Sequence, residues 1–229
     1  IYAPTLALRE LHPEYADRIP SVAEQFTPDN HHDMVRFEIM KQFGYFVTES
    51  SEHSSEYYPW FIKKDHPELI DRFHIPLDEY PRRCRDQIAR WKQQAEHLVH
   101  NENLTHTRSS EYAAGIIEAL ETGRTFGFAG NVLNTGLIDN LPFDACVEVS
   151  CMVNEGHLSP CHMGPLPNQL AALNRRQIEV HQLTVDAALT RKKEYIYQAA
   201  MLDPHAGSEL TIDEIRSLVD DLIQAHGDW

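Results

Sequence analysis

The sequence predicts an α+β fold in which helices pack on an antiparallel sheet. Apolar residues recur at helical spacing before Thr125 and again after Pro167. Between these stretches, a segment around Val149 alternates apolar and polar residues with the period of a strand. Strands and helices do not alternate along the chain, as they do in a parallel sheet. We therefore expect residues 1–229 to form a single α+β domain.

The first part of the chain is predicted to be helical. The prolines before Asn30 favour a loop or short helical turns. Apolar residues then follow a helical stripe over residues 34–43, and Gly44 is expected to end that helix. A short helix is expected over residues 65–73. The apolar spacing over residues 84–98 predicts a longer helix that packs lengthwise on one partner surface.

The centre of the chain is predicted to form the sheet. A helix over residues 112–120, with Ser109 or Ser110 as its N-cap and Gly123 at its end, precedes it. The strand-like segments that follow are 125–132, 137–141 and 146–153, with a turn at 134–136. We expect these segments to form an antiparallel meander.

The last part of the chain is again predicted to be helical. Pro165 and Pro167 open a long helical region over residues 169–201, which Asp203-Pro204 ends. Thr211 and Glu214 have the spacing of a capping box, which predicts a final helix.

Composition and charge exclude several classes of function. Lys and Arg number 20 against 35 Asp and Glu, and the net charge of −15 argues against nucleic acids and anionic membranes as partners. No apolar stretch approaches the roughly 20 residues that span a bilayer, and Ile1 does not open a secretory leader. We therefore expect a cytoplasmic protein. Because the chain lacks an initiator Met, we also expect a fragment of a longer protein.

Motifs for dinucleotides and metals are weak. The run Gly127-Phe128-Ala129-Gly130 does not open a predicted helix, so it is not read as a dinucleotide site. The four cysteines form no Cys-x-x-Cys pair. Cys161-His162 has two metal-ligating side chains, but a loop thiol beside a solvated histidine is the favoured interpretation.

A polar cluster from Thr48 to His53 is the strongest candidate for chemistry. Two carboxylates and an imidazole directly follow a segment that we expect to be buried. Partial burial raises the pKa of a carboxylic acid and suits it to proton transfer, and a neighbouring histidine can orient it. From spacing alone, however, a polar N-terminal cap for the next segment is the favoured interpretation.

Several longer motifs resemble those of a known family in content and in order. They include residues 36–53, Pro59-Trp60-Phe61-Ile62-Lys63, Pro76-Leu77-Asp78-Glu79-Tyr80-Pro81-Arg82-Arg83-Cys84, Gly136-Leu137-Ile138-Asp139-Asn140-Leu141-Pro142 and Asp203-Pro204-His205. Together they resemble glycoside hydrolase family 4, the NAD- and manganese-dependent glycosidases, and in particular its α-galactosidase (melibiase) branch.

The resemblance implies an enzyme that hydrolyses α-galactosides such as melibiose. In this family, hydrolysis proceeds by oxidation with NAD, elimination and addition of water, and a divalent metal, usually Mn²⁺, polarises sugar oxygens. The resemblance also implies the fold of the C-terminal domain of these lactate/malate dehydrogenase-like glycosidases. That domain binds substrate and forms a homo-oligomer, a dimer or a tetramer.

The family motifs that bind the cofactors are absent from this sequence. They are a glycine-rich dinucleotide turn, a Cys-His-Ser motif and a Gly-Ile-Asn-His motif, all in the family's N-terminal half. The resemblance therefore implies that the N-terminal Rossmann domain is absent here. We expect this chain alone to bind neither NAD nor Mn²⁺ and to have no hydrolase activity.

The resemblance assigns roles to a few residues. Glu49 corresponds to the base that removes the proton from sugar carbon 2, while a slip of about one residue in the alignment leaves Tyr45 and Ser50 open. Ser50 is also expected to bind substrate. His53 is expected to act with Glu49 or to donate a hydrogen bond to a sugar hydroxyl. Arg36 is expected to contact a substrate oxygen, and its alternative is a surface ion pair.

Further candidates have a functional and a structural interpretation. Asn131 is expected to contact substrate, and both it and Asn134 are equally suited to shaping a turn. Tyr57, Tyr58 and Trp60 have ring faces that can stack on sugars, although a place in the core or in a subunit interface is favoured.

Two other functions stay open at this point. An α-glucosidase or an α-galacturonidase of the same family is one, and a galacturonidase would need a cationic group facing the sugar carboxylate. A non-catalytic assembly module is the other, because long amphipathic helices suit subunit contacts.

Overall fold

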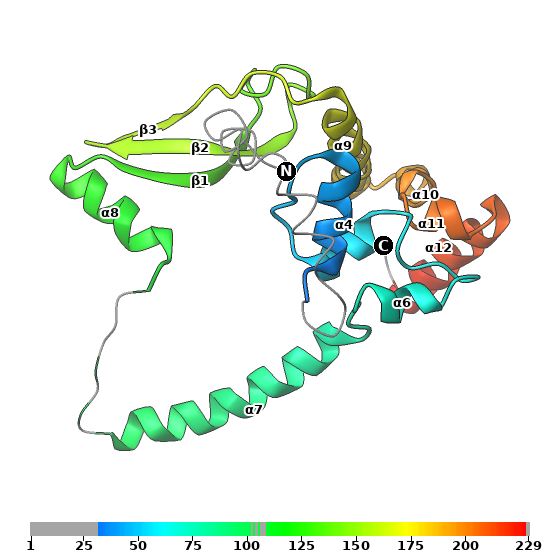
Figure 1. The fold of residues 1–229 in the computed structure, drawn as a ribbon, viewed down its shortest axis with the longest axis horizontal. Helices are drawn as coiled ribbons and strands as arrows, with labels where there is room; N and C mark the ends of the chain where they lie inside the picture. Colours follow the sequence, from blue (N-terminus) through cyan, green and yellow to red (C-terminus); the bar gives the residue numbers. More distant parts are fainter. Residues whose placement is uncertain (1–31, 102, 104, 106–108, 228–229) are drawn as a thin grey trace. The chain divides into compact units, whose positions relative to one another are not determined.

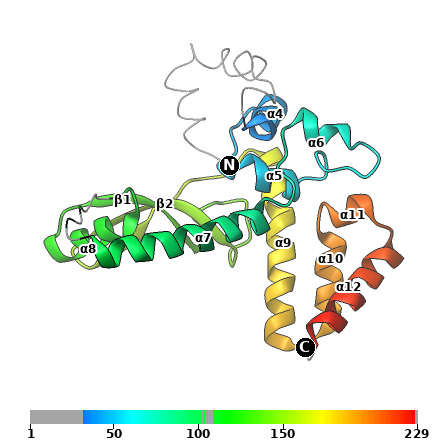
Figure 2. The ribbon, with the colours of Figure 1, turned by 90° about the horizontal axis from the view of Figure 1, so that it is seen from below.

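The computed structural model describes residues 32–101, 103, 105 and 109–227, which divide between two compact units (Figures 1 and 2). Of the described residues, 32–75, 129–151 and 160–227 belong to the larger unit, and 152–159 with the described part of 76–128 belong to the smaller unit. Helices together with a small antiparallel sheet confirm the predicted class. The loop expected before Asn30 lies outside the described residues.

The larger unit has an apolar core around its first helix. Helix α4 (Met34–Phe43) ends as predicted at Gly44, whose φ of 79° is a left-handed conformation that glycine adopts without steric cost. Val35 and Ile39 of α4 are buried in this core. The other buried members of the cluster are Val47, Tyr58, Phe61, Phe73 and Ile75. Helix α5 (Ser51–Tyr57) packs on α4, and the short helix α6 (Glu68–Arg72) follows.

The C-terminal helices of the larger unit pack on one another. They are α9 (Asn168–Thr190), α10 (Lys193–Leu202), α11 (Ala206–Glu209) and α12 (Ile212–His226). Helix α10 lies against both α9 and α12 (Figure 2). The expected helical region is interrupted at Arg191, which takes a left-handed φ of 59° and allows α10 to fold back on α9.

The start of α12 confirms the predicted capping box. The Thr211 hydroxyl accepts a hydrogen bond from the Glu214 N–H, and the Glu214 carboxylate accepts one from the Thr211 N–H. The short helix α11, which the sequence patterns did not indicate, precedes it. Its last residue, Glu209, forms an ion pair with Lys63 and accepts a hydrogen bond from the N–H of Lys64 at 2.9 Å.

The bonds to Lys63 and Lys64 lower the pKa of Glu209 to about 2, from an ordinary value of 4.5. A depressed pKa means that the folded state favours the carboxylate, so this stabilisation is complete above pH 4.5 and is lost as the pH falls toward 2. We expect Glu209→Gln to lower the melting temperature most at neutral pH and least near pH 2. Calorimetry of both proteins across this range measures the difference, and a difference independent of pH would contradict the assignment.

The sheet contains β1 (Phe126–Leu133), β2 (Cys146–Asn154) and β3 (His157–Pro160), in the order β1-β2-β3. The alternation predicted for residues 146–153 is confirmed in β2, because Val147, Val149, Cys151 and Val153 are buried and the residues between them are exposed. A turn containing Gly156, with φ 81°, joins β2 to β3.

The strand expected over residues 137–141 is wrong, since this segment is a loop. The buried amide of Asn134 donates hydrogen bonds to the carbonyls of Ile138, Leu141 and Pro142. These carbonyls are therefore directed at a side chain and cannot pair with a neighbouring strand. The third strand of the meander is β3 instead.

The smaller unit contains α7 (Glu79–His100) and α8 (Tyr112–Thr122). Helix α8 ends at Gly123 as predicted, but its N-cap is Glu111 and not Ser109 or Ser110. The Ser109 hydroxyl accepts a hydrogen bond from the Glu111 N–H at 3.3 Å and so organises the turn before the helix.

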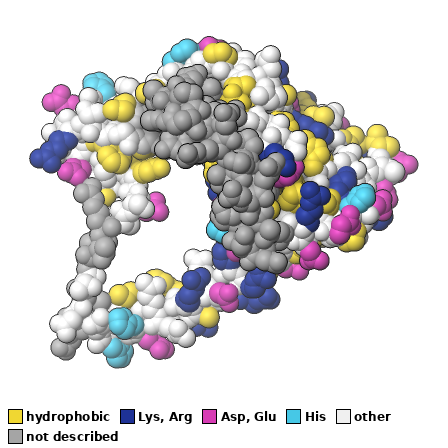
Figure 3. Space-filling model, in the orientation of Figure 1, with side chains coloured by type: hydrophobic (Ala, Val, Ile, Leu, Met, Phe, Trp, Pro, Cys, Tyr) yellow, Lys and Arg dark blue, Asp and Glu magenta, His cyan; other side chains and the backbone are white. Residues whose placement is uncertain are grey.

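The apolar stripe of α7 is not covered in the described chain. None of the residues of this helix is buried, and the side chains of Ile88 and Trp91 are 60% and 61% exposed. Hydrophobic side chains are visible among charged ones along this helix in Figure 3. The expectation that α7 packs lengthwise on a partner surface is therefore wrong for the described part of this chain, which supplies no such surface.

Two further observations concern the whole set of described residues. No helix among them is both long and apolar enough to cross a lipid bilayer. The four cysteines, all within the described ranges, are free thiols.

Candidate functional site

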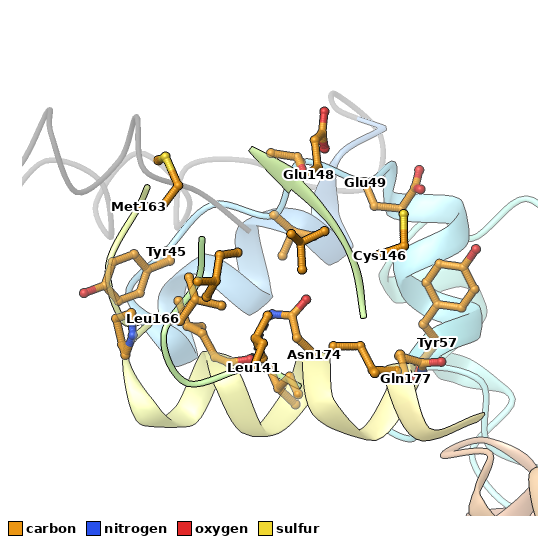
Figure 4. Close-up of a pocket in the computed structure, with 18 of the residues that line it drawn as sticks. Tyr45, Glu49, Tyr57, Leu141, Cys146, Glu148, Met163, Leu166, Asn174 and Gln177 are labelled. Carbon is orange, nitrogen blue, oxygen red and sulfur yellow. Dashed lines mark hydrogen bonds between the residues drawn. The ribbon is translucent and has the colours of Figure 1, made fainter. Parts of the chain in front are cut away.

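A pocket of about 350 Å³ lies in the larger unit (Figure 4). Its walls come from the connection between α4 and α5, from the loop that follows β1, from the start of β2 and from α9. Its polar lining residues are Tyr45, Thr48, Glu49, Tyr57, Tyr58, Cys146, Glu148, Asn174, Gln177 and His181. Its apolar lining residues include Val47, Ile138, Leu141, Leu166 and Leu170.

Glu49 lines this pocket, which places the sequence-predicted base at a cavity. Its Oε1 accepts a hydrogen bond from the N–H of Ser50 at 2.8 Å. The expectation that partial burial prepares this carboxylate is wrong, because Glu49 is exposed. Val47 is the last buried residue of the connection, and the chain reaches the surface before α5 begins.

Ser50 is the N-cap of α5. Its hydroxyl accepts a hydrogen bond from the backbone N–H of His53 at 3.2 Å. The capping interpretation of the polar cluster is therefore confirmed at this position. The substrate contact expected of Ser50 stays a prediction, and the hydroxyl proton is available for it.

His53 lies one turn into α5, and its hydrogen-bond partner is Glu56 rather than Glu49. The His53 Nδ1 is 3.0 Å from the Glu56 Oε2, and the imidazole stacks on the ring of Tyr57 at a centroid distance of 6.2 Å. The hydrogen bond to Glu56 raises the pKa of His53, with the charges of Glu49 and Glu52 adding to it and partial burial opposing it. His53 does not line the pocket, so its role in the reaction stays a prediction.

This pairing makes the pKa of His53 sensitive to a single substitution. Because Glu56 stabilises the imidazolium, the contribution to folding is present below the ordinary value of 6.5 and is lost as the pH rises through the raised pKa. We expect Glu56→Gln to lower the pKa of His53 toward 6.5 or below it. NMR titration of the imidazole resonances measures this, with His53→Gln as the assignment control, and an unchanged pKa would exclude the Glu56 contact.

Tyr57 lines the same pocket as Glu49, the predicted base. Burial and the negative charge of Glu49 raise the pKa of the Tyr57 phenol, so its hydroxyl stays protonated at neutral pH and can donate a hydrogen bond. Its side chain is 44% exposed. Tyr58 is buried in the core, and its ring stacks on Trp60 at 5.3 Å, which confirms the core interpretation for Tyr58.

Arg36 holds the connection that carries Glu49. Its Nε and Nη2 donate hydrogen bonds to the carbonyl of Val47 at 3.0 and 2.8 Å, and its guanidinium lies 4.1 Å from the ring centroid of Phe46. Arg36 also forms an ion pair with Asp33 at 3.3 Å, but both side chains are mostly buried, so the pair is not the surface pair expected as the alternative. Arg36 does not line the pocket, and its contact with substrate stays a prediction.

The two asparagines near the end of β1 have different surroundings. Asn134 is fully buried and organises the following loop, which supports the turn-shaping interpretation. Asn131 lies on the exposed face of β1, so its substrate contact also stays a prediction.

One face of α9 belongs to the pocket and was not anticipated from the sequence. Asn174, Gln177 and His181 are spaced by three and four residues, which places them on one side of a helix. Gln177 donates a hydrogen bond to the carbonyl of Tyr57 at 3.0 Å and so joins α9 to α5. The spacing is visible in the sequence, but a polar stripe alone does not indicate which cavity it faces.

Figure 4 shows the polar groups on two sides of the pocket. Asn174 and Gln177 project from α9, and the carboxylates of Glu49 and Glu148 lie on the opposite side in this view. Glu148 comes from the exposed face of β2, where the strand alternation directs it outward. The sequence patterns did not single it out.

The described residues do not fit a dinucleotide or a metal at this pocket. The sheet is three-stranded and antiparallel, unlike the parallel sheet and glycine-rich turn that hold a pyrophosphate. Glu52, His53 and Glu56 are the one described group of three whose ligand atoms lie within 4.8 Å of one another, and they do not line the pocket. His162 is exposed and is 2.7 Å from Asp139, in agreement with the solvated loop histidine expected there.

Comparisons with known proteins identify the family. Residues 7–206 match the family 4 glycosyl hydrolase C-terminal domain. The chain is 56% identical over 220 residues to an α-galactosidase of Bacillus subtilis, covering 96% of this chain and 50% of that protein. It is 31% identical over 208 residues to an α-galactosidase of Rhizobium meliloti, covering 86% of this chain and 42% of that protein. The chain thus spans about half the length of the curated relatives it matches.

Solved structures have the same fold. A Bacillus subtilis protein described as a glucosidase, LplD, superimposes with a TM-score of 0.76 at 22% identity, over 94% of this chain and 50% of that one. A 6-phospho-α-glucosidase from gut microorganisms, crystallised with NAD and Mn²⁺, superimposes with a TM-score of 0.61 at 20% identity, over 93% of this chain and 49% of that one. The match over residues 7–206 and the shared fold lead to one conclusion: the chain belongs to glycoside hydrolase family 4 and corresponds to its C-terminal domain.

Proposed function

We propose that this chain is the C-terminal, substrate-binding and oligomerisation part of a cytoplasmic α-galactosidase, which hydrolyses α-galactosides by NAD-dependent oxidation, elimination and addition with a divalent metal. The observation that supports this most strongly is the 56% identity to the Bacillus subtilis α-galactosidase across almost the whole chain. In the complete enzyme, bound NAD would supply redox chemistry at sugar carbon 3, and a bound Mn²⁺ would polarise the neighbouring oxygens. Because the described pocket residues fit neither group, we assign the binding of both to the part of the relatives' length that this chain does not span.

The pocket supports this proposal by its size and lining. Its volume of about 350 Å³ falls within the range of roughly 300–1,000 Å³ typical of small-molecule sites. The amides of Asn174 and Gln177 offer hydrogen bonds to sugar hydroxyls, and Leu141 and Leu166 offer apolar surface to the ring. Glu49 is the carboxylate that we assign as base for the carbon-2 proton.

The side chains next to Glu49 suit it to this task. Its exposed carboxylate accepts one hydrogen bond, from the N–H of Ser50. Tyr57 stays protonated beside it and can donate a hydrogen bond to a sugar oxygen. His53 and Arg36 act from outside the pocket, His53 through its charge and Arg36 by holding Val47 in place.

A turnover assay in D₂O tests the proposal. The complete enzyme, supplied with NAD and Mn²⁺, is expected to release p-nitrophenol from its α-galactoside and to incorporate deuterium at carbon 2 of the galactose produced. The isolated chain is expected to release none. Turnover that needs no NAD, or galactose that keeps its carbon-2 hydrogen, would refute the mechanism.

A non-catalytic assembly role is the second candidate, and the uncovered apolar stripe of α7 favours it. A dimer or tetramer held through α7 is expected to lose mass in light scattering when Trp91 is replaced by Glu. If turnover survives Glu49→Gln, this chain assembles the enzyme without contributing to the chemistry.

A further inference from the structure

The pocket carries formal negative charge and no formal positive charge. Its lining residues, all of which are described, include Glu49 and Glu148 and no Lys or Arg. No Lys or Arg of the described residues pairs with either carboxylate: Glu49 accepts one backbone N–H and acts by its charge on the His53 imidazole, and the Glu148 carboxylate has no hydrogen bond or ion pair to a described residue. The charge of both side chains is therefore available to act on a ligand.

Arginines on the same elements are directed elsewhere. Arg36 of α4 donates to the carbonyl of Val47, and Arg175 of α9 donates to the carbonyl of Asn140. Arg175 is the immediate neighbour of Asn174, which lines the pocket, yet its guanidinium is held on the loop that follows β1. The fold thus keeps these two cations out of the pocket lining.

This arrangement discriminates between sugars that differ only at carbon 6. A galacturonide carries a carboxylate and a 6-phosphorylated sugar carries a phosphate, whereas a galactoside is neutral. A charged side chain in a binding site weakens the binding of a ligand with the same charge. Such repulsion of a competing ligand is a common source of specificity. A neutral sugar meets no such opposition in this pocket.

We propose that Glu148 is a specificity-determining residue, which together with Glu49 excludes anionic glycosides and reserves the pocket for neutral α-galactosides. This inference rests on the proposed function. Glu148 is the better residue for a test, because it takes no part in the proposed chemistry and lies on the exposed face of a regular strand. Removing the charge of Glu148 changes the electrostatic potential in the pocket and leaves the proposed base, Glu49, in place.

The test compares D-galactose with D-galacturonate as inhibitors of α-galactoside hydrolysis by the complete enzyme. We expect Glu148→Gln to lower the inhibition constant of galacturonate by about fivefold or more, since one unit charge a few ångströms away in water has an effect of this order. The inhibition constant of galactose is expected to change far less, so the ratio of the two inhibition constants measures the effect of the charge. Added salt is expected to strengthen galacturonate inhibition of the unmodified enzyme and to have less effect on the variant.

Glu179→Gln is the matched control, because it removes the same charge from an exposed position of α9 outside the pocket. It is expected to leave both inhibition constants unchanged, and Glu148→Lys is expected to reverse the preference. The proposal is overturned if galacturonate inhibits the unmodified enzyme as well as galactose does, or if Glu148→Gln shifts the inhibition constants of both sugars alike. Absence of NAD-dependent α-galactosidase activity refutes the proposed function instead, and calorimetric titration with the two sugars then tests the charge selection directly.

Discussion

Glu49→Gln is expected to lower kcat of the complete enzyme by about 10²- to 10⁴-fold, the usual contribution of a positioned general base. Glutamine keeps the shape of the side chain and an oxygen for the Ser50 N–H, so α5 is expected to begin at the same residue. What the variant loses is the ability to accept a proton from sugar carbon 2. Steady-state kinetics with a p-nitrophenyl α-galactoside measures the effect.

The controls separate loss of the base from loss of the fold. Glu179→Gln is expected to have the kcat of the unmodified enzyme, because its side chain lies on α9 outside the pocket. Deuterium exchange at carbon 2 is expected to disappear together with turnover in Glu49→Gln. If Glu49→Gln turned over substrate as fast as the unmodified enzyme, another residue would have to be the base. This result would favour an assembly role for the chain.

Asn134→Ala is expected to destabilise the larger unit by about 2–4 kcal/mol, because it leaves several buried polar groups without partners. The Asn134 side chain is fully buried, accepts a hydrogen bond from the Ile138 N–H at 2.9 Å and donates to the carbonyls of Ile138, Leu141 and Pro142. Alanine can replace none of these bonds. Since Ile138 and Leu141 line the pocket, a rise in KM is also expected.

Denaturant unfolding and hydrogen exchange over residues 135–142 measure this effect. The amides of the loop are expected to exchange faster in Asn134→Ala while those of α12 are unchanged. Asn131→Ala is the matched control, because Asn131 lies on the exposed face of β1, where substitutions usually change stability by less than about 0.5 kcal/mol. Equal stabilities for the two variants would show that the Asn134 network does not hold the loop.

The candidate site was recovered from the sequence only in part. The family resemblance pointed to Glu49, and the structure places Glu49 at a pocket. It did not indicate Glu148 or the face of α9, because these residues come from elements that are distant in the chain and meet only through packing. His53 was also expected to act with Glu49, whereas one turn of helix brings Glu56 to the imidazole.

The sequence by itself determined the features that depend on neighbouring residues. Gly44 ends α4, Thr211 and Glu214 cap α12, and the alternation along β2 sets which of its residues are buried. Each of these follows from backbone conformation or side-chain direction over a few positions, so a short stretch of sequence contains the whole cause.

Only the tertiary structure decided the features that depend on what surrounds a segment. Residues 137–141 have a strand-like composition. The buried Asn134 side chain, however, donates hydrogen bonds to carbonyls of this segment, which forms a loop that lines the pocket. The apolar stripe of α7 predicted a packed helix, yet none of the residues of α7 is buried in the described chain. The negative charge of the pocket comes from Glu49 and Glu148, which are about 100 positions apart in the sequence. Arg36 and Arg175 do not offset this charge, because their guanidinium groups donate hydrogen bonds to backbone carbonyls. Packing, and not distance along the sequence, therefore sets the charge of the pocket lining.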